Sequence, residues 1–215
     1  YYNKIFDKKL LAKIKNRILN NVKLSKKLFN LKYPNYLLLG GKQSKNNYSD
    51  YKLKGNATKE LYSHTLDYND YLDKLKNKKS ERLVNDKYAV LIDAPGPLFL
   101  ADALTLGYNK SRLSTKNYFP SINNFLSILE NYFDLKFVIA GHPHSKYEEF
   151  PKYFDSRRVI YNKTGELIKD CEFVVTRGST AINFAVIFNK PILFYTTKEC
   201  ELYQDIRESI LSYAS

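Results

Sequence analysis

Short apolar runs, each followed by a helical pattern, dominate the chain from residue 88 onward. The runs are rich in β-branched and aromatic residues and predict strands, and the segments between them carry apolar residues at helical spacing. Strands that alternate with helices predict a parallel sheet with right-handed crossovers and helices on its faces. We therefore expect an α/β fold. The predicted strands cover residues 88–93, 136–140, 158–161, 173–176 and 191–195. A long loop is predicted over 94–120, and helices are predicted over 121–134, 146–154, 164–170, 180–188 and 199–211.

The first 87 residues differ from the rest in charge and in pattern. They hold 21 Lys and Arg against 8 Asp and Glu, whereas residues 88–215 hold 14 of each. Apolar residues at helical spacing predict a lysine-rich helix over residues 3–30, and short strands follow at 36–41 and 60–64. We expect a basic, mainly helical N-terminal portion over 1–87 and a sheet domain over 88–215.

The basic portion has three interpretations. It is a solvated surface in a lysine-rich protein, or it contacts an anionic membrane or a lipid-linked acceptor, or it binds nucleic acid. No nucleic-acid motif is present, so we expect no nucleic-acid partner. The sequence has no apolar run near the ~20 residues of a membrane span, and its two cysteines lack metal or redox spacing. We expect a cytoplasmic protein with buried thiols. If it contacts a membrane, we expect the contact at the inner face of the plasma membrane.

Polar side chains follow the predicted strands where each strand ends. In a parallel sheet the carboxyl ends of the strands share one edge, and ligands bind there. Most of the candidate anion-binding groups of the chain converge on this edge. They are Asp93, His142, Lys163, Thr164, Arg177, Gly178, Ser179, Thr180, Thr196 and Thr197.

Residues 173–188 carry the most informative of these strand ends. A β-branched run stops at Gly178, two hydroxyl residues follow, and a buried helical pattern begins. Unpaired backbone N–H groups and the helix dipole would make an anion site there, with Arg177 as a forked cation. The alternative is that Ser179 is only a helix cap and Arg177 only a surface charge.

Several enzyme classes lack their signatures here. The chain has no Gly-x-Gly-x-x-Gly, no Walker loop, no nucleophile elbow and no metal-ligand spacing among its three histidines. We expect neither a metal nor a cofactor. The strand ends instead carry hydrogen-bond donors and cationic side chains. Such groups can hold a diphosphate and stabilise its negative charge when it departs as a leaving group.

The order of these motifs resembles the donor half of GT-B glycosyltransferases. Strand–Gly-His142-Pro143, strand–Arg-Gly-Ser179-Thr180–helix and Lys190-Pro191-Ile192–strand follow one another, and the His-Pro and Ser-Thr pairs are similar to those of bacterial sialyltransferases and related capsule or lipopolysaccharide transferases. The resemblance covers about residues 88–197. It implies a Rossmann-like, GT-B C-terminal domain, with residues 1–87 as the tail of an incomplete acceptor-side domain and a linker.

The resemblance also implies roles for individual residues. His142, Ser179 and Thr180 would contact the donor phosphates, and His142 would assist departure of the leaving group. This requires His142 and the hydroxyl pair to face one another across a crevice about a phosphate wide. Asp93 would be the base or a donor-sugar contact, although a structural, loop-capping Asp fits its position too. His64 and Asp67 are either an acceptor-side base with its orienter or a structural His with a helix cap.

The function implied is transfer of a sugar from a nucleotide donor, CMP- or UDP-linked, to a glycan or lipid-linked acceptor of a surface polysaccharide, without a metal. No Asp-x-Asp of the metal-dependent glycosyltransferase fold is present. Two alternatives remain open. One is a nucleotide-sugar 2-epimerase, whose fold is similar, and the other is a non-catalytic scaffold that binds an anionic partner through the basic portion.

Overall fold

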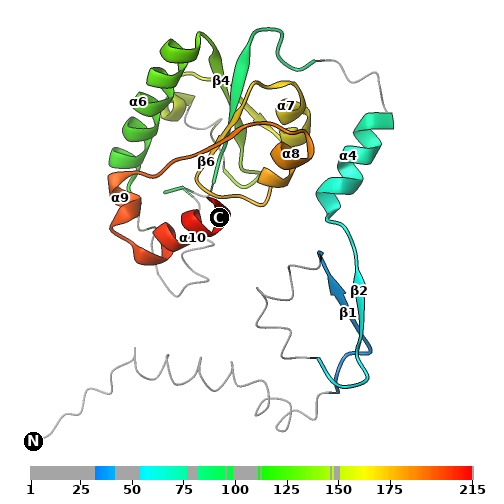
Figure 1. Ribbon diagram of the computed structural model, residues 1–215. Helices are drawn as coiled ribbons and strands as arrows, with labels where there is room; N and C mark the ends of the chain where they lie inside the picture. Colours follow the sequence, from blue (N-terminus) through cyan, green and yellow to red (C-terminus); the bar gives the residue numbers. More distant parts are fainter. Residues whose placement is uncertain are drawn as a thin grey trace, which may run out of the picture. The chain divides into compact units, whose positions relative to one another are not determined.

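The chain divides into two compact units, Tyr1–Thr65 and Leu66–Ser215 (Figure 1). The computed structural model describes residues 32–41, 54–76, 82–94, 96–98, 111, 113–145, 147 and 151–214. The predicted helix over 3–30 lies outside the described residues, as do residues 99–110 of the long loop after the first sheet strand.

The described part of the smaller unit holds two short strands. Strand β1 (Tyr36–Leu39) pairs in parallel with β2 (Lys59–Tyr62), which confirms both predicted strands. The turn before β2 is fixed by Thr58, whose hydroxyl donates to the Pro34 carbonyl at 2.6 Å and accepts from the Gly55 N–H at 3.0 Å.

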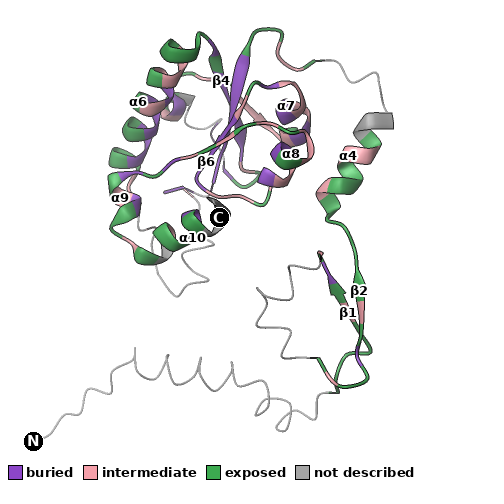
Figure 2. Ribbon diagram, in the orientation of Figure 1, coloured by how far each residue is buried: buried purple, intermediate pink, exposed green. Residues whose placement is uncertain are grey.

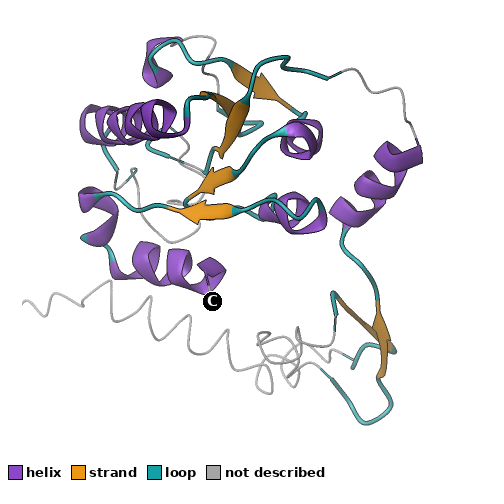
Figure 3. Ribbon diagram, turned by 45° about the horizontal axis from the view of Figure 1, so that its top comes forward, coloured by secondary structure: helices purple, strands orange, loops and turns teal. Residues whose placement is uncertain are grey.

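The larger unit is a five-stranded parallel sheet with helices on both faces, as the sequence predicts (Figure 3). All four strand pairs are parallel. The strands are β3 (Tyr88–Ile92), β4 (Lys136–Gly141), β5 (Val159–Tyr161), β6 (Val174–Thr176) and β7 (Ile192–Phe194). The other elements are α4 (Leu66–Lys76), α6 (Thr115–Phe133), the 3-10 helix η3 (Pro151–Phe154), α7 (Thr164–Asp170), α8 (Ile182–Ile187), α9 (Lys198–Glu201) and α10 (Gln204–Ala214).

The strand order is β5-β4-β3-β6-β7. The chain builds outward from β3 to β5, returns through α7 to the other side of β3, and continues outward to β7. The order therefore reverses between β3 and β6. In open α/β sheets, this switch point opens a crevice at the carboxyl ends of the strands.

The central strands are buried on both faces, which is why they read as continuous apolar runs (Figure 2). Side chains alternate, so Leu91, Ile139 and Val175 pack with the core under α6. Their neighbours Val90, Val138 and Val174 pack on the opposite face with α7 and α8. This alternation fixes the face to which each strand-end side chain points.

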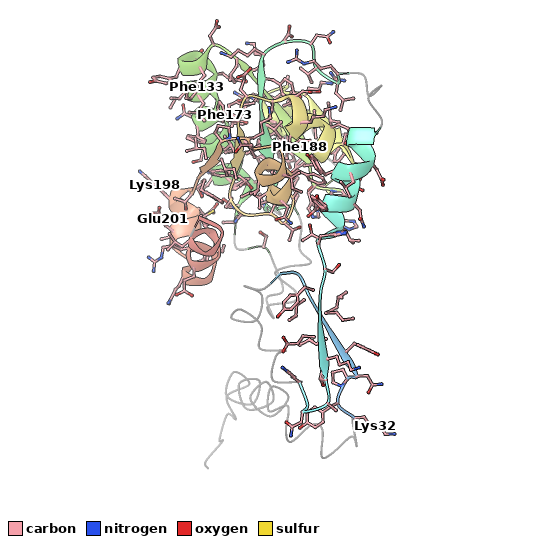
Figure 4. All side chains as sticks on the ribbon, turned by 45° about the vertical axis from the view of Figure 1, so that its right-hand side comes forward. Lys32, Phe133, Phe173, Phe188, Lys198 and Glu201 are labelled. Carbon is pink, nitrogen blue, oxygen red and sulfur yellow. The ribbon has the colours of Figure 1, made fainter. Side chains whose placement is uncertain are left out.

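Helix α4 belongs to the larger unit. The Tyr71 ring lies 5.2 Å from the Phe188 ring at the end of α8 (Figure 4), and the Asn183 amide donates to the Asp67 carboxylate at 2.8 Å. The compact unit thus begins at Leu66, earlier than the predicted boundary at residue 88. A side-chain tie over more than a hundred residues leaves no local signal in the sequence.

Helix α6 begins earlier than predicted. The sequence favoured a loop up to Pro120, but the helix begins at Thr115 and contains the proline. The Ser114 hydroxyl accepts from the Asn117 N–H at 3.3 Å, and Tyr118 and Phe119 are buried in the core. Capping and burial of two aromatic rings outweigh the ~3 kcal/mol that an interior proline costs.

Two further elements differ from prediction. The predicted closing helix over 199–211 is two helices, α9 and α10, because the chain turns at Tyr203, whose N–H donates to the Cys200 carbonyl at 3.1 Å. Helix α8 is shorter than the predicted 180–188. It ends at Ile187. Asn189, two residues later, takes a left-handed conformation at φ 53°, and the Lys190 N–H donates to the Ala185 carbonyl at 2.8 Å.

Candidate functional site at the carboxyl edge of the sheet

The ends of β3, β4 and β6 lie at one level of the sheet. Ile92 of β3 is in register with Ala140 of β4 on one side and with Thr176 of β6 on the other. Asp93, Gly141 and Arg177 are therefore the next residues of three neighbouring strands. This juxtaposition at the switch point is the centre of the candidate site.

The predicted spacing across the site is too small. Strand β3 lies between β4 and β6, and neighbouring strands are about 4.8 Å apart, so the backbones that follow β4 and β6 are about 10 Å apart. His142 and the Ser179–Thr180 pair follow these two strands. They flank an edge wider than a single phosphate, with Asp93 between them.

Asp93 is 3% exposed and connects two turns of this edge. Its Oδ2 accepts from the Tyr147 hydroxyl at 2.8 Å and from the His142 backbone N–H at 3.3 Å. Burial raises the pKa of Asp93 to about 6, although both hydrogen bonds and the Arg177 charge oppose the shift. A carboxyl that titrates near 6 accepts protons effectively at neutral pH. These contacts also fit the structural alternative, a loop-capping Asp.

His142 is held by its own turn. Its Nδ1 accepts from the His144 N–H at 3.3 Å and its carbonyl accepts from the Ser145 N–H at 2.9 Å. With Nδ1 as an acceptor, the neutral ring carries its proton on Nε2. The ring is half-buried. His144 is exposed.

Arg177 is not a surface charge, so that alternative was wrong. The residue is 9% exposed, and its guanidinium lies 5.8 Å from the centre of the Tyr118 ring and 3.8 Å from the Cys200 sulfur. The Tyr118 hydroxyl in turn pairs with the Tyr195 hydroxyl at 2.8 Å. The Arg177 side chain therefore points into the core under α6.

The start of α8 differs from the predicted row of unpaired N–H groups. The N–H groups of Ile182, Asn183 and Phe184 each donate to the backbone carbonyl three positions earlier. The Ser179 hydroxyl accepts from the Ala181 N–H at 3.3 Å, and Ala181 occupies the cap position itself. The helix has only six residues. The N–H groups of the helix itself are therefore paired, so any anion contact falls to the turn that precedes it.

The turn before α8 retains donors. Gly178 has φ 152°, a conformation that favours glycine, and its N–H donates to the Thr176 hydroxyl at 3.2 Å. The N–H groups of Ser179 and Thr180 have no hydrogen-bond acceptor in the described part of the chain. Thr180 is exposed. An anion would meet these two N–H groups and the Thr180 hydroxyl.

The remaining predicted residues lie around this edge or away from it. Lys163 is exposed at the cap position of α7 and pairs with Glu166 at 3.2 Å, and half-buried Thr164 begins the helix. Asp67 accepts from Asn183 and is a structural contact. His64 belongs to the smaller unit, where its Nδ1 lies 3.2 Å from the Thr65 carbonyl oxygen.

A cleft of about 620 Å³ opens beside this edge, between the first turns of α6 and α9. Lys116 and Lys198 contribute ammonium groups to it, and Thr197 follows β7 directly. Figure 4 shows Lys198 on α9. Neither lysine was predicted as a site residue, because no local sequence pattern indicates that residues 82 positions apart line one cleft.

Tyr147, whose hydroxyl donates directly to Asp93, was not predicted as a site residue either. Tyr147 lies 54 residues from Asp93, in a segment predicted only as a short helix. A buried tyrosine has the same sequence pattern as any aromatic core residue. Its role was therefore not readable before the fold was known.

Substitution of Gly141 by Ala should disturb the site through β5. An added Cβ would lie 2.7 Å from the Tyr161 ring and 2.8 Å from Val159. The Tyr161 hydroxyl accepts from the Tyr147 N–H at 2.9 Å, so a displaced ring shifts the turn that holds Asp93. We expect a loss of ~1–3 kcal/mol in unfolding free energy, measured by urea denaturation. Gly40→Ala is the control, because nothing lies within 4 Å of its added Cβ; equal losses in the two variants would contradict the clash.

The described residues contain neither a candidate membrane-spanning helix nor a candidate metal site. No helix among them is long and apolar enough to cross a bilayer, and no three His, Cys, Asp or Glu side chains among them gather as metal ligands. Both cysteines are buried, as predicted. A comparison with protein-family models, curated proteins and solved structures finds no match to this chain.

Proposed function

We propose that this chain binds a nucleotide sugar at the carboxyl edge of its sheet and acts as a metal-independent glycosyltransferase of the GT-B type. The observation that carries the proposal is the shared register of β3, β4 and β6, which brings Asp93, His142 and the Gly178–Thr180 turn to one switch point. The strand order, written by position in the chain as 3-2-1-4-5, is that of Rossmann-like nucleotide-binding sheets.

The chemistry of the edge supports a diphosphate ligand. The Ser179 and Thr180 N–H groups are neutral donors on one side of it, and the His142 imidazole lies on the other. Lys163, which pairs with Glu166, follows β5 at the same edge. Strand ends about 10 Å apart leave room between them for two linked phosphates. Asp93, with a pKa of about 6, would be the base for the acceptor hydroxyl.

The acceptor side of the proposal rests on charge. Residues 1–87 carry the whole net charge of +13, since residues 88–215 are balanced. A surface glycan on an anionic lipid carrier at the inner face of the plasma membrane is the acceptor that this charge favours. Capsule and lipopolysaccharide are the polysaccharides suggested by the His-Pro and Ser-Thr pairs.

A thermal-shift titration with CMP, UDP and GDP tests nucleotide binding in the 215-residue chain. We expect one nucleotide to raise the melting temperature, and calorimetry to give an affinity about tenfold weaker in His142→Ala and in Thr180→Gly. The controls are His144→Ala, which keeps the backbone bond to His142, and Ser63→Ala in the smaller unit. Unchanged affinity in both site variants would refute the assignment, and turnover of a UDP sugar without acceptor would indicate an epimerase instead.

A further inference from the structure

Arg177 and Asp93 leave adjacent strands at the same level and point to the same face. Their preceding residues, Thr176 and Ile92, are register partners. Side chains alternate along a strand, and Val175 and Leu91 both pack under α6, so the next odd-numbered side chains point there too. Asp93 meets Tyr147 on that face and Arg177 meets Tyr118, which confirms the direction.

Both groups are buried, and each is costly to bury alone. Exposed fractions of 3% for Asp93 and 9% for Arg177 remove most of their hydration. Removing Arg177 would leave the buried Asp93 carboxylate uncompensated whenever it is ionised. The direct partners of Asp93 are a hydroxyl and a backbone N–H, neither of which carries charge. We propose that Arg177 is the buried counter-ion that keeps the Asp93 carboxylate charged and in place, and is not a ligand of the donor phosphates.

The surroundings of the pair support this role. The guanidinium contacts the Tyr118 ring of α6 and the Cys200 sulfur of α9, and these two helices therefore fix its position. The attraction of Arg177 lowers the pKa of Asp93 against the effect of burial. The titratable and charged groups that face Asp93 are Tyr147 after β4, Tyr118 on α6, Tyr195 after β7, Arg177 after β6 and the turn of His142.

The ionisation of Asp93 can be isolated without any nucleotide. The unfolding free energy of a protein with Asp93, minus that of its Asp93→Asn counterpart, is measured from pH 4 to pH 9. The pH above which this difference stops changing reports the folded-state pKa of Asp93. We expect about 6 with Arg177 present, and a value higher by about one pH unit or more with Arg177→Met. Arg177→Lys keeps the charge and should remain closer to the original value.

Each outcome decides the inference. An Arg177→Met chain that folds at pH 5 but not at pH 8 supports it, because protonated Asp93 needs no counter-ion. An unchanged pH dependence in Arg177→Met overturns it, and a tenfold loss of nucleotide affinity with unchanged pH dependence would make Arg177 a phosphate ligand. Since the titration involves no nucleotide, its failure is distinguishable from failure of the proposed function.

Discussion

Asp93→Asn should make the protein more stable and remove its proposed activity. At pH 8 the wild-type carboxyl is ionised in the folded state, and a pKa raised from 3.8 to about 6 corresponds to a cost of ~3 kcal/mol. Asparagine has nearly the same shape, and its oxygen still accepts from Tyr147 and from the His142 N–H. The pKa of about 6 already includes the attraction of Arg177, so, allowing for the new amide group, we expect a gain of ~1–3 kcal/mol in unfolding free energy at pH 8.

The sign of the pH dependence distinguishes this from an ordinary surface effect. The folded-state pKa of Asp93 lies above its unfolded value, so its contribution to stability is fully present below about pH 4 and is lost as pH rises through about 6. Wild type and Asp93→Asn should therefore converge in urea denaturation at pH 4 and diverge by pH 7. The exposed Asp86→Asn is the control and should follow wild type throughout.

The catalytic half of this prediction concerns turnover. If Asp93 takes the proton of the acceptor hydroxyl, its amide cannot, and the rate should fall ~10²–10⁴-fold while nucleotide affinity changes little. Turnover is measured with the nucleotide sugar that the thermal-shift titration selects. A variant that is more stable and fully active would make Asp93 a structural residue only.

Arg157→Met should give the largest loss of stability. Arg157 forms two bonds to the Glu130 carboxylate, at 2.7 and 3.1 Å, and a third to the Ser127 hydroxyl at 2.8 Å. Glu130 also accepts from the Phe137 N–H at 2.8 Å, so the pair joins α6, the turn after η3 and the start of β4. With the two side chains only 9% and 15% exposed, loss of one leaves a largely buried charge. We expect a loss of ~2–4 kcal/mol by urea denaturation at pH 7.

Two comparisons control this prediction. Arg158→Met changes the neighbouring, exposed arginine, which donates to the Leu83 carbonyl, and should change unfolding free energy by less than about 0.5 kcal/mol. Burial would raise the pKa of Glu130, but bonds from Arg157 and Phe137 outweigh it and lower the pKa. The contribution is therefore present above about pH 4 and lost as pH falls, so Glu130→Gln should approach wild type in acid. Equal losses in Arg157→Met and Arg158→Met would contradict the network.

The parallel sheet and the edge that carries the candidate site were predictable because their signals are local. Short apolar runs rich in β-branched residues indicate each strand, and the segments between them have helical spacing. Once strands and helices alternate, right-handed crossovers bring the strand ends to one edge. Asp93, His142 and Gly178 were placed there from position in the chain alone, and the register confirms it.

Boundaries were less predictable, because packing over long distances outweighs local preference. Pro120 indicates a helix break, yet α6 passes through it, since the Ser114 cap and two buried aromatic rings stabilise the longer helix. Helix α4 lies within the N-terminal portion predicted over 1–87 but joins the larger unit through Asn183 and Phe188. Neither outcome is encoded within a window of a few residues.

The sequence by itself determined the α/β class, the strand sequence and the edge at which polar groups collect. Only the tertiary structure decided which of those groups are buried and what they contact: Asp93 bonded to Tyr147, Arg177 turned under Tyr118, and the first N–H groups of α8 already paired. The physical reason is that strand and helix preferences act over a few residues. Burial, and with it the charge state of Asp93, depends on residues 49 to 84 positions away.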